Sequence, residues 1–451
     1  MANKIKIHKK GFIFPILFLA AFPVFSQVDY TVVKLNGGRV SFCPSTNKIA
    51  YDRPDTNGYY NVYVTDTNGI GLTNITNKPE APQKHNGCPE WHPDGKWMVF
   101  QSQIDSVPDI YDPVCGPGIG VFTNIWVTDS VGSQFWQLTA YPYSFPAQAT
   151  LHPHFSPDGT KLLWSHLIDD NLGPHGHWLI HIADFSVDTA GAPSLQNIQT
   201  IHPGATPYLM YESHGFSPGG DTIYFSSPMD NTEYYDWDIY AYGLTDSQLT
   251  NLTHSLGVWD EHTHVSPDGT KIVWSSSQGT PLDTARHDSI RLDWWMMDID
   301  GSNKKQISHF NTPGYPEYTP GRKGCSDFSW GNNSNQFYGF LQSENSAFGS
   351  VIKVEFEEPL HSGEIENGLN QVRIFPNPVY LKINVELEKP VLHPVITIMN
   401  VSGQILKVKK FSPGNHFVFP CKNIKNGVYF LQIEDDFEII DCKRIVIFHD
   451  S

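Results

Sequence analysis

Positive charge is scarce in this chain. Its 30 Lys and Arg residues stand against 47 Asp and Glu residues, which gives a formal net charge of −17 at pH 7. A surface this acidic repels the phosphates of nucleic acids and of anionic membranes, so neither is expected as a partner. It also disfavours a polyanionic polysaccharide, unless a local basic pocket overrides the average charge.

Cysteine and long apolar runs are also scarce. Six cysteines do not make a dense disulfide framework in 451 residues. Cys421 and Cys442 are the best candidate pair because both fall in the C-terminal part, and isolated buried thiols are the open alternative. After residue 26 no stretch is long and apolar enough to cross a bilayer, so no transmembrane segment is expected.

Several catalytic motifs are missing. The chain has no Gly-x-Ser-x-Gly elbow, no Walker or dinucleotide glycine pattern and no His-Glu-x-x-His. Residues 358–451 are too few for a hydrolase domain, so a serine peptidase with its catalytic domain at the C-terminus is excluded.

What the sequence does contain is a repeat built on a Pro-Asp-Gly type of turn. The copies are Phe42–Thr46, Trp91–Gly95, Phe155–Gly159, Phe216–Gly220 and Val265–Gly269, with a sixth, proline-free copy at Asp327–Trp330. The proline presets φ, and the glycine, or Asn47 in one copy, supplies the positive φ that closes a hairpin. A second strand pair around an Asp/Asn-Gly turn follows in most copies. Six four-stranded meanders predict an all-β fold, a six-bladed β-propeller over residues 27–357.

These repeats resemble a known family. Phe155–Trp164 and Val265–Trp274 look like the TolB-type propeller repeat. The resemblance implies the fold only, because this repeat occurs in proteins of unrelated function. Residues Tyr30–Leu35 alternate in polarity, and we expect them to close the ring as the outer strand of the last blade beside Val351–Phe356.

The sequence predicts targeting signals near both ends of the chain. Residues 1–26 combine four lysines with the apolar run Phe12–Phe25, which is typical of a cleaved secretory signal peptide. Residues 358–370 are polar and predict a linker. Residues 371–451 alternate in period two, which predicts a small C-terminal β-sandwich.

The C-terminal residues resemble the sorting domain of type IX secretion substrates. The resemblance rests on Phe375-Pro-Asn-Pro378, Ser402-Gly-Gln404, Asn426-Gly-Val-Tyr429 and the closing Lys443–Ile447. It implies the type IX secretion machinery as a partner and a secreted, extracellular or outer-surface location. A carbohydrate-binding sandwich is the alternative.

Histidines gather where the inner strands of the predicted blades begin. The segments read Leu151-His-Pro-His154, Glu212-Ser-His214 and Glu261-His-Thr-His264, with Glu90 and Asp327 near the same place in two other blades. Residues two apart in a strand share a face, so each His-x-His pair is expected to present both imidazoles together. The second-to-third-strand loops are long on this same rim, which is typical of a binding site.

Two sets of site residues follow. The predicted ligand-binding rim consists of Glu90, His154, His214, His264 and Asp327. The predicted metal ligands are His152, His154, His214, His262 and His264, with manganese, zinc or nickel as candidate cofactor. Solvated channel histidines that only bond to neighbouring blades are the alternative.

Glu261-His-Thr-His264 also resembles, over a short match, the arrangement in propeller-type oligogalacturonate lyases, which hold a catalytic metal with histidines on inner strands. Trp259 stands at the position expected of a glutamine ligand, and the resemblance assigns no catalytic base. Two hypotheses result. The first is a secreted or cell-surface binding module that recognises a protein, peptide or glycan on the loop-rich rim. The second is a metal-dependent polysaccharide lyase that uses the histidine cluster.

Overall fold

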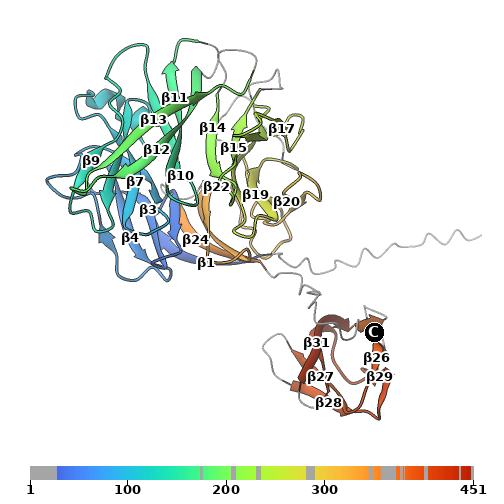
Figure 1. Ribbon diagram of the computed structural model, residues 1–451. Coiled ribbons are helices and arrows are strands. Elements are labelled where there is room, and N and C mark those ends of the chain that lie inside the picture. Colours follow the sequence, from blue (N-terminus) through green and yellow to red (C-terminus); the bar gives the residue numbers. More distant parts are fainter. Residues whose placement is uncertain are drawn as a thin grey trace, which may run out of the picture. The chain divides into compact units, whose positions relative to one another are not determined.

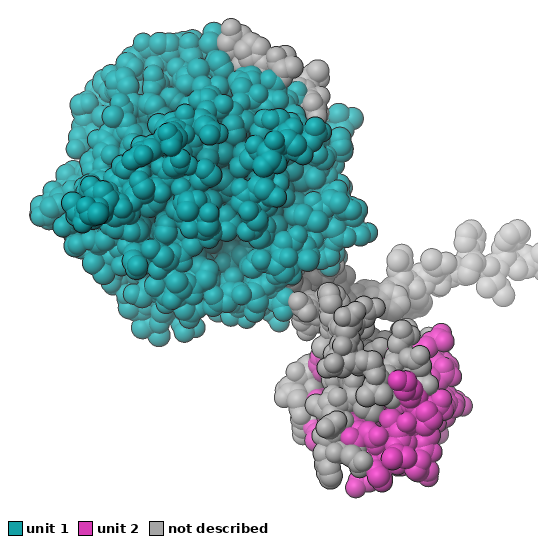
Figure 2. Space-filling view, viewed as in Figure 1, with its two compact units in different colours: residues 1–356 teal, residues 357–451 magenta. Residues whose placement is uncertain are grey.

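The computed structural model describes eleven stretches of the chain. They are residues 28–172, 176–204, 210–229, 235–280, 290–344, 349–356, 372–375, 379, 381–400, 405–435 and 438–447. The predicted signal peptide, the predicted linker and the Ser402-Gly-Gln404 turn lie outside the described residues. The chain divides into two compact units, residues 1–356 and 357–451 (Figure 2).

The first unit is built from four-stranded antiparallel sheets, six of them within the described residues (Figure 1). The first three, each in chain order, are β2 (Val40–Cys43), β3 (Lys48–Pro54), β4 (Tyr60–Asp66) and β5 (Thr73–Asn74); β6 (Asn86–Trp91), β7 (Trp97–Gln103), β8 (Thr123–Asp129) and β9 (Phe135–Gln137); and β10 (Ala149–Phe155), β11 (Lys161–Asp169), β12 (His177–Val187) and β13 (Pro193–Ile201).

Three further sheets complete the unit. They are β14 (Glu212–Phe216), β15 (Thr222–Ser227), β16 (Asp238–Gly243) and β17 (Leu249–Asn251); β18 (Asp260–Val265), β19 (Lys271–Ser276), β20 (Asp293–Asp298) and β21 (Lys305–Gln306); and β22 (Lys323–Trp330), β23 (Gln336–Ser343) and β24 (Ser350–Phe356) joined by β1 (Val28–Leu35).

The first strands of the sheets form a closed ring. β2 contacts β6, β6 contacts β10, and the series continues through β14, β18 and β22 back to β2. The sheets are therefore the blades of a β-propeller, and their first strands line its axis. This confirms the predicted propeller.

The ring is closed by the two ends of the unit. β1 pairs antiparallel with β24 from Val28 opposite Phe356 to Leu35 opposite Ser350, with a bulge between Val32 and Lys34. β1 (blue in Figure 1) is the outer strand of the last blade, beside β24 (orange). The predicted pairing of Tyr30–Leu35 with Val351–Phe356 is confirmed, and it removes an open sheet edge.

The repeat turns have the expected backbone. Asn47 has a φ of 54°, and Gly159 and Gly269 have values of 73° and 74°. In the third blade Ser156 Oγ donates to Asp158 Oδ1 at 2.6 Å, and the same carboxylate accepts the backbone N–H of Thr160 at 3.0 Å. The Ser-Pro-Asp-Gly sequence thus satisfies its own polar groups at the tip of the hairpin.

The core lies between blades. Second strands pack on neighbours through both faces, so they are apolar without alternation: Ile272, Val273 and Trp274 are all fully buried. Short runs of this kind follow each turn in the sequence. The loop between β7 and β8 holds the 3₁₀ turn η1 (Asp109–Tyr111) and the short helix α1 (Asp112–Cys115). Within the described residues no helix is long and apolar enough to span a membrane.

The second unit consists of two small sheets around its own core. One contains β25 (Val372–Phe375), β26 (Lys382–Val391) and β29 (Gly414–Pro420); the other contains β27 (Pro394–Asn400), β28 (Ile405–Lys410), β30 (Gly427–Asp435) and β31 (Glu438–Ile447). Along β26 the alternate residues Ile383, Val385 and Leu387 are buried. This period-two pattern against a second sheet is a small β-sandwich, as predicted.

The predicted Cys421–Cys442 disulfide is not formed. Cys421 is a free thiol buried in the core of the second unit, and the side chain of Cys442 lies outside the described residues. Burial raises the pKa of the Cys421 thiol to about 11, which makes it unreactive at neutral pH. For Cys421 the alternative, an isolated buried thiol, is therefore correct.

Candidate functional site

Two cavities follow the propeller axis. The larger, of about 520 Å³, is walled by the turn residues Pro44, Pro93, Pro157, Pro218 and Pro267. The smaller, of about 350 Å³, is walled by residues of the loop-rich side such as Gly118, Trp259 and Arg322. Arg39, His152 and Asp327 line both cavities, so a polar layer separates them.

Bulges in the inner strands place the side chains of this layer. The register of β10 shifts between Leu151 and His154, and that of β18 shifts between Glu261 and His264. The first residue of each bulge has a left-handed backbone, with φ of 48° at His152 and 49° at His262. A bulge inserts a residue and turns its side chain. The two histidines of each His-x-His segment are two residues apart along the strand and lie at different depths along the axis.

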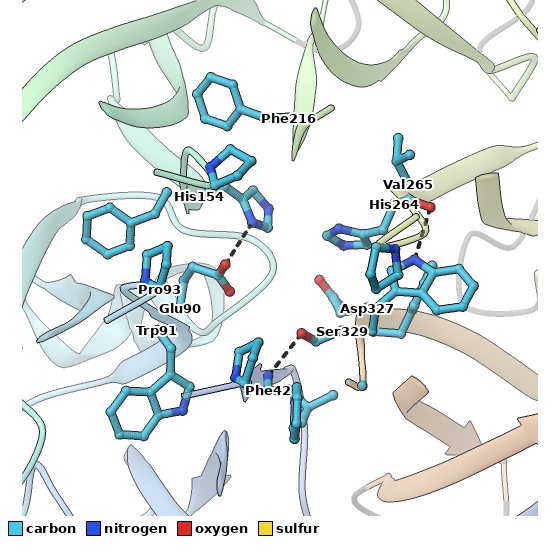
Figure 3. A pocket seen from close by; sticks show the side chains of 18 of the residues that line it. Phe42, Glu90, Trp91, Pro93, His154, Phe216, His264, Val265, Asp327 and Ser329 are labelled. Carbon is cyan, nitrogen blue, oxygen red and sulfur yellow. Dashed lines mark hydrogen bonds and ion pairs between the residues drawn. The ribbon is translucent and has the colours of Figure 1, made fainter. Parts of the chain in front are cut away.

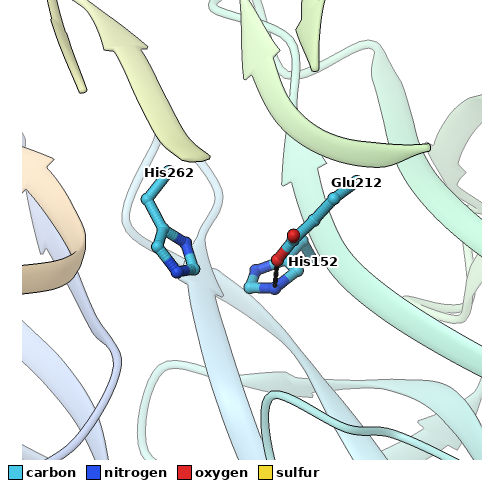
Figure 4. A group of neighbouring side chains, drawn as sticks. All are labelled: His152, Glu212 and His262. Carbon is cyan, nitrogen blue, oxygen red and sulfur yellow. Dashed lines mark ion pairs between the residues drawn. The ribbon is translucent and has the colours of Figure 1, made fainter. Parts of the chain in front are cut away.

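His152, Glu212 and His262 form the centre of the layer (Figure 4). One ligand-type atom from each lies within 4.8 Å of the others, and all three residues are buried. His152 Nε2 is 2.8 Å from Glu212 Oε1. The three side chains come from β10, β14 and β18, three successive blades.

Asp327 lies beside both imidazoles. Its Oδ1 is 3.3 Å from His152 Nδ1 and 3.5 Å from His262 Nδ1. Ser326 Oγ donates to its second oxygen at 2.9 Å. Burial acts to raise the pKa of Asp327, but the nearby cationic groups, His262 first, outweigh burial and hold that pKa below its ordinary value.

Arg39 is the cation that spans the layer. Its Nε is 4.0 Å from Asp327 Oδ2, and its Nη1 is 3.6 Å from Asp52 Oδ1. The loop between β7 and β8 lies directly against it, because a Cβ built on Gly118 would be 2.2 Å from an Arg39 guanidinium nitrogen. A long loop on this rim thus reaches the channel.

Charge in the layer depends on protonation. Burial acts to lower the pKa of His262, but the adjoining carboxylates, Asp327 first, outweigh it and raise that pKa to about 10. For His214 and His264 burial dominates, and neighbouring imidazoles add to it, so their pKa values lie well below the ordinary one. With no other cation bound, His262 is therefore charged and the other two are neutral.

His214 is committed to internal hydrogen bonds. Its Nε2 accepts the backbone N–H of His262 at 3.2 Å and also contacts Ser226 Oγ. That nitrogen is an acceptor already in use, and His214 lies outside the group of three ligand-type side chains. Its predicted place among the metal ligands is not supported by this geometry.

The remaining predicted residues lie on the turn side. His154, His264 and Glu90 line the larger cavity together with the turn prolines (Figure 3). The two imidazole rings are 5.4 Å apart, and His154 Nδ1 is 3.9 Å from Glu90 Oε1. His154 Nε2 is buried and makes no hydrogen bond within the described part of the chain.

The sequence therefore predicted that these side chains lie close together, but not at which level of the channel each one lies. The structure brings the five histidines, Glu90 and Asp327 together around one axis. The expectation that all of them lie on the loop-rich rim is wrong. The inner strands run toward the turns, so His154 and His264, two residues further along than His152 and His262, line the turn-side cavity. Arg39 was missed since a lone arginine after Gly37-Gly38 matches no motif, and Glu212 was noted only as a neighbour of His214.

Comparison with known proteins decides the nature of the second unit. Residues 373–447 match the family described as secretion system C-terminal sorting domain. The chain carries a sorting domain. This domain indicates export through type IX secretion, to the cell surface or the extracellular space. No curated protein matches the chain.

The solved structures similar to this chain include one from each of the two propeller families that its sequence resembles. A putative TolB from Agrobacterium tumefaciens shares 14% identity over 73% of this chain and 98% of its own, with a TM-score of 0.44. An oligogalacturonate lyase from Vibrio parahaemolyticus shares 12% identity over 70% of this chain and 76% of its own, with a TM-score of 0.40. Identities and TM-scores this low carry no argument about activity. The assignment of the propeller fold is based on the sheet topology described above.

Proposed function

We propose that this protein is an exported binding module whose ligand enters the loop-side cavity. The proposal is carried by the composition of that cavity, in which Trp259, Arg322 and Gln342 approach the buried layer of carboxylates and imidazoles. Its volume of about 350 Å³ is at the small end of ligand sites. A single sugar unit or amino-acid side chain of a larger glycan or peptide fits such a space.

The location of the cavity supports the same conclusion. Its walls come from segments before β14, β16, β18, β20 and β22, and from the β7–β8 loop through Gly118. Loops on a rigid scaffold can vary without disturbing the blades. The sorting domain places the propeller outside the cell, where peptides and glycans are accessible.

Binding to glycan and peptide arrays tests the proposal, with purified full-length chain as the probe. We expect a ligand whose affinity falls about tenfold or more in Gln342→Ala or Arg322→Gln. Glu90→Gln is the matched control because Glu90 lines only the turn-side cavity. Loss of binding in the control alone would transfer the site to the turn side and overturn the proposal.

A second candidate function is a metal-dependent polysaccharide lyase. It is favoured by the meeting of His152, Glu212 and His262 in reach of the same cavity. Trp259 is buried and stacks on Trp237 with ring centroids 4.6 Å apart, so the position expected of a glutamine ligand holds an indole. Formation of unsaturated sugar products from polygalacturonate in the presence of Mn²⁺ would support this candidate, and their absence would rule it out for that polymer.

A further inference from the structure

We propose that His152, Glu212 and His262 bind one divalent first-row transition-metal ion at the centre of the channel. This inference is independent of the binding function, because metal uptake is measured with no organic ligand present. It uses only three side chains that the fold already holds together (Figure 4).

The ligand set has the right chemistry. Two imidazoles and one carboxylate suit Mn²⁺, Fe²⁺, Co²⁺, Ni²⁺ or Zn²⁺ and leave coordination positions open. Two ligand atoms bound to one such ion lie about 3 Å apart, since each bond is about 2.1 Å. His152 Nε2 and Glu212 Oε1 are separated by 2.8 Å, and atoms of all three residues lie within 4.8 Å. Small side-chain movements complete the set.

The surroundings of the site hold the imidazoles in place. Asp327 adjoins Nδ1 of both histidines and is itself fixed by Ser326 and Arg39. Carboxylates behind metal-binding histidines orient the ring and increase its basicity. Asp327 is therefore a positioning residue for both ligands.

The layer also has an excess of buried negative charge. The carboxylates of Glu212, Glu261 and Asp327 have side-chain exposures of 8%, 14% and 13%. Arg39, the nearby guanidinium, is shared with a fourth carboxylate, Asp52. Buried anions need a compensating cation, and a divalent ion between these groups supplies it.

His152 and His262 occupy equivalent positions in their blades. Each has a left-handed backbone at the bulge of an inner strand, as Cys88 has in β6. Both imidazoles line the smaller cavity. For His262 the neighbours of both ring nitrogens are defined, since Nδ1 lies 3.5 Å from Asp327 Oδ1 and Nε2 lies 3.0 Å from Ser326 Oγ.

The smaller cavity gives the ion its access. His152, Glu212 and His262 all line it, together with Glu261 and Arg322. An exchangeable ligand therefore approaches the open coordination positions from the loop side.

Titration of the untagged, chelator-treated full-length chain with Co²⁺ tests the proposal through visible absorption and calorimetry. We expect one equivalent per chain. Glu212→Gln should weaken binding at least a hundredfold, and Asp327→Asn about 10 to 100-fold. Glu90→Gln is the control, since it removes a channel carboxylate outside the set and should leave affinity unchanged.

The result that overturns the proposal is an absence of stoichiometric Co²⁺, Mn²⁺ or Zn²⁺ binding at about 0.1 mM metal, or a Glu212→Gln affinity equal to that of the parent. If Glu212→Gln fails to fold, the test uses His152→Gln instead. The metal-dependent change in melting temperature is then compared between this variant and the parent chain. A metal-dependent rise in melting temperature that His152→Gln abolishes supports the site. A rise that is unchanged in His152→Gln refutes it.

Discussion

Arg39 and Asp52 form an ion pair inside the propeller. Arg39 Nη1 lies 3.6 Å from Asp52 Oδ1, and the side chains are 17% and 0% exposed. Asp52 also accepts the backbone N–H groups of Arg39 at 3.2 Å and of Cys88 at 3.0 Å. Burial acts against the charge of Arg39, but Asp52 outweighs it and raises the guanidinium pKa above its ordinary value.

Removing one partner of this pair should be costly. In Asp52→Ala the guanidinium of Arg39 loses its nearest anion and two backbone donors lose an acceptor. We expect a loss of about 3 to 5 kcal/mol in the free energy of unfolding, measured by urea denaturation. Lys353→Ala, which breaks the surface pair with Glu355, should change stability little. Equal losses of unfolding free energy in Asp52→Ala and Lys353→Ala would contradict the view that the buried ion pair matters more than the surface one.

The contact between the β7–β8 loop and Arg39 can be tested through one glycine. Gly118 has a φ of 86°, and an added Cβ would lie 2.2 Å from the guanidinium. Gly118→Ala should cost about 1 to 3 kcal/mol of folding free energy. Gly116→Ala in the same loop is the control, since a Cβ there meets nothing within 4 Å. Comparable melting temperatures for the two variants would disprove the close approach.

His214 should prove structural. Its Nε2 accepts the backbone N–H of His262, so His214→Ala leaves a buried donor without its acceptor. We expect a loss of about 1 to 3 kcal/mol by chemical denaturation. This structural role differs from the sequence-based assignment of His214 to the ligand-binding rim. A His214→Ala protein as stable as the parent would contradict the structural role.

A pH effect on stability should come from His166, away from the channel layer. Its Nδ1 shares a 3.0 Å hydrogen bond with His181, and its ring stacks on Tyr141 at 3.8 Å. Burial, then His181, lowers the pKa of His166 to about 3. As pH falls from about 6.5 to 3 the unfolded chain takes up a proton that the folded protein refuses, so stability falls by up to about 1.4 kcal/mol per pH unit.

The variant His166→Gln isolates this contribution. Its unfolding free energy, measured by urea denaturation across the same range, should fall less steeply with acid than that of the parent. Parallel pH profiles for the two proteins would show that His166 does not contribute.

Deleting residues 371–451 should separate folding from export. The propeller and the second unit are independent compact units, so the shortened chain should keep the β-sheet circular dichroism of the propeller. It should accumulate in the periplasm, because it lacks the sorting domain. Cell fractionation measures this, and fusion of residues 371–451 to a secreted reporter is the complementary control. Export of the shortened chain at normal levels would refute the role of the sorting domain.

Sequence patterns identified the parts of this protein whose chemistry is local. The Pro-Asp-Gly turns follow from backbone requirements of single residues, and the alternation in Tyr30–Leu35 anticipated its pairing with β24. The cavity that each histidine lines was not accessible in this way. Period-two alternation predicts that His152 and His154 share a face at successive levels, but the two cavities exist only once six blades close around the axis. The meeting of Arg39 with Asp327 is likewise a property of the closed ring.

The way the last blade is assembled also sets the timing of folding. β22, β23 and β24 come from the end of the propeller sequence, whereas β1 is among its first residues. A chain that is still being synthesised can form its early blades, yet β1 has no partner until β24 has appeared. Ring closure is therefore a late event, which occurs only after every other strand of the propeller is available.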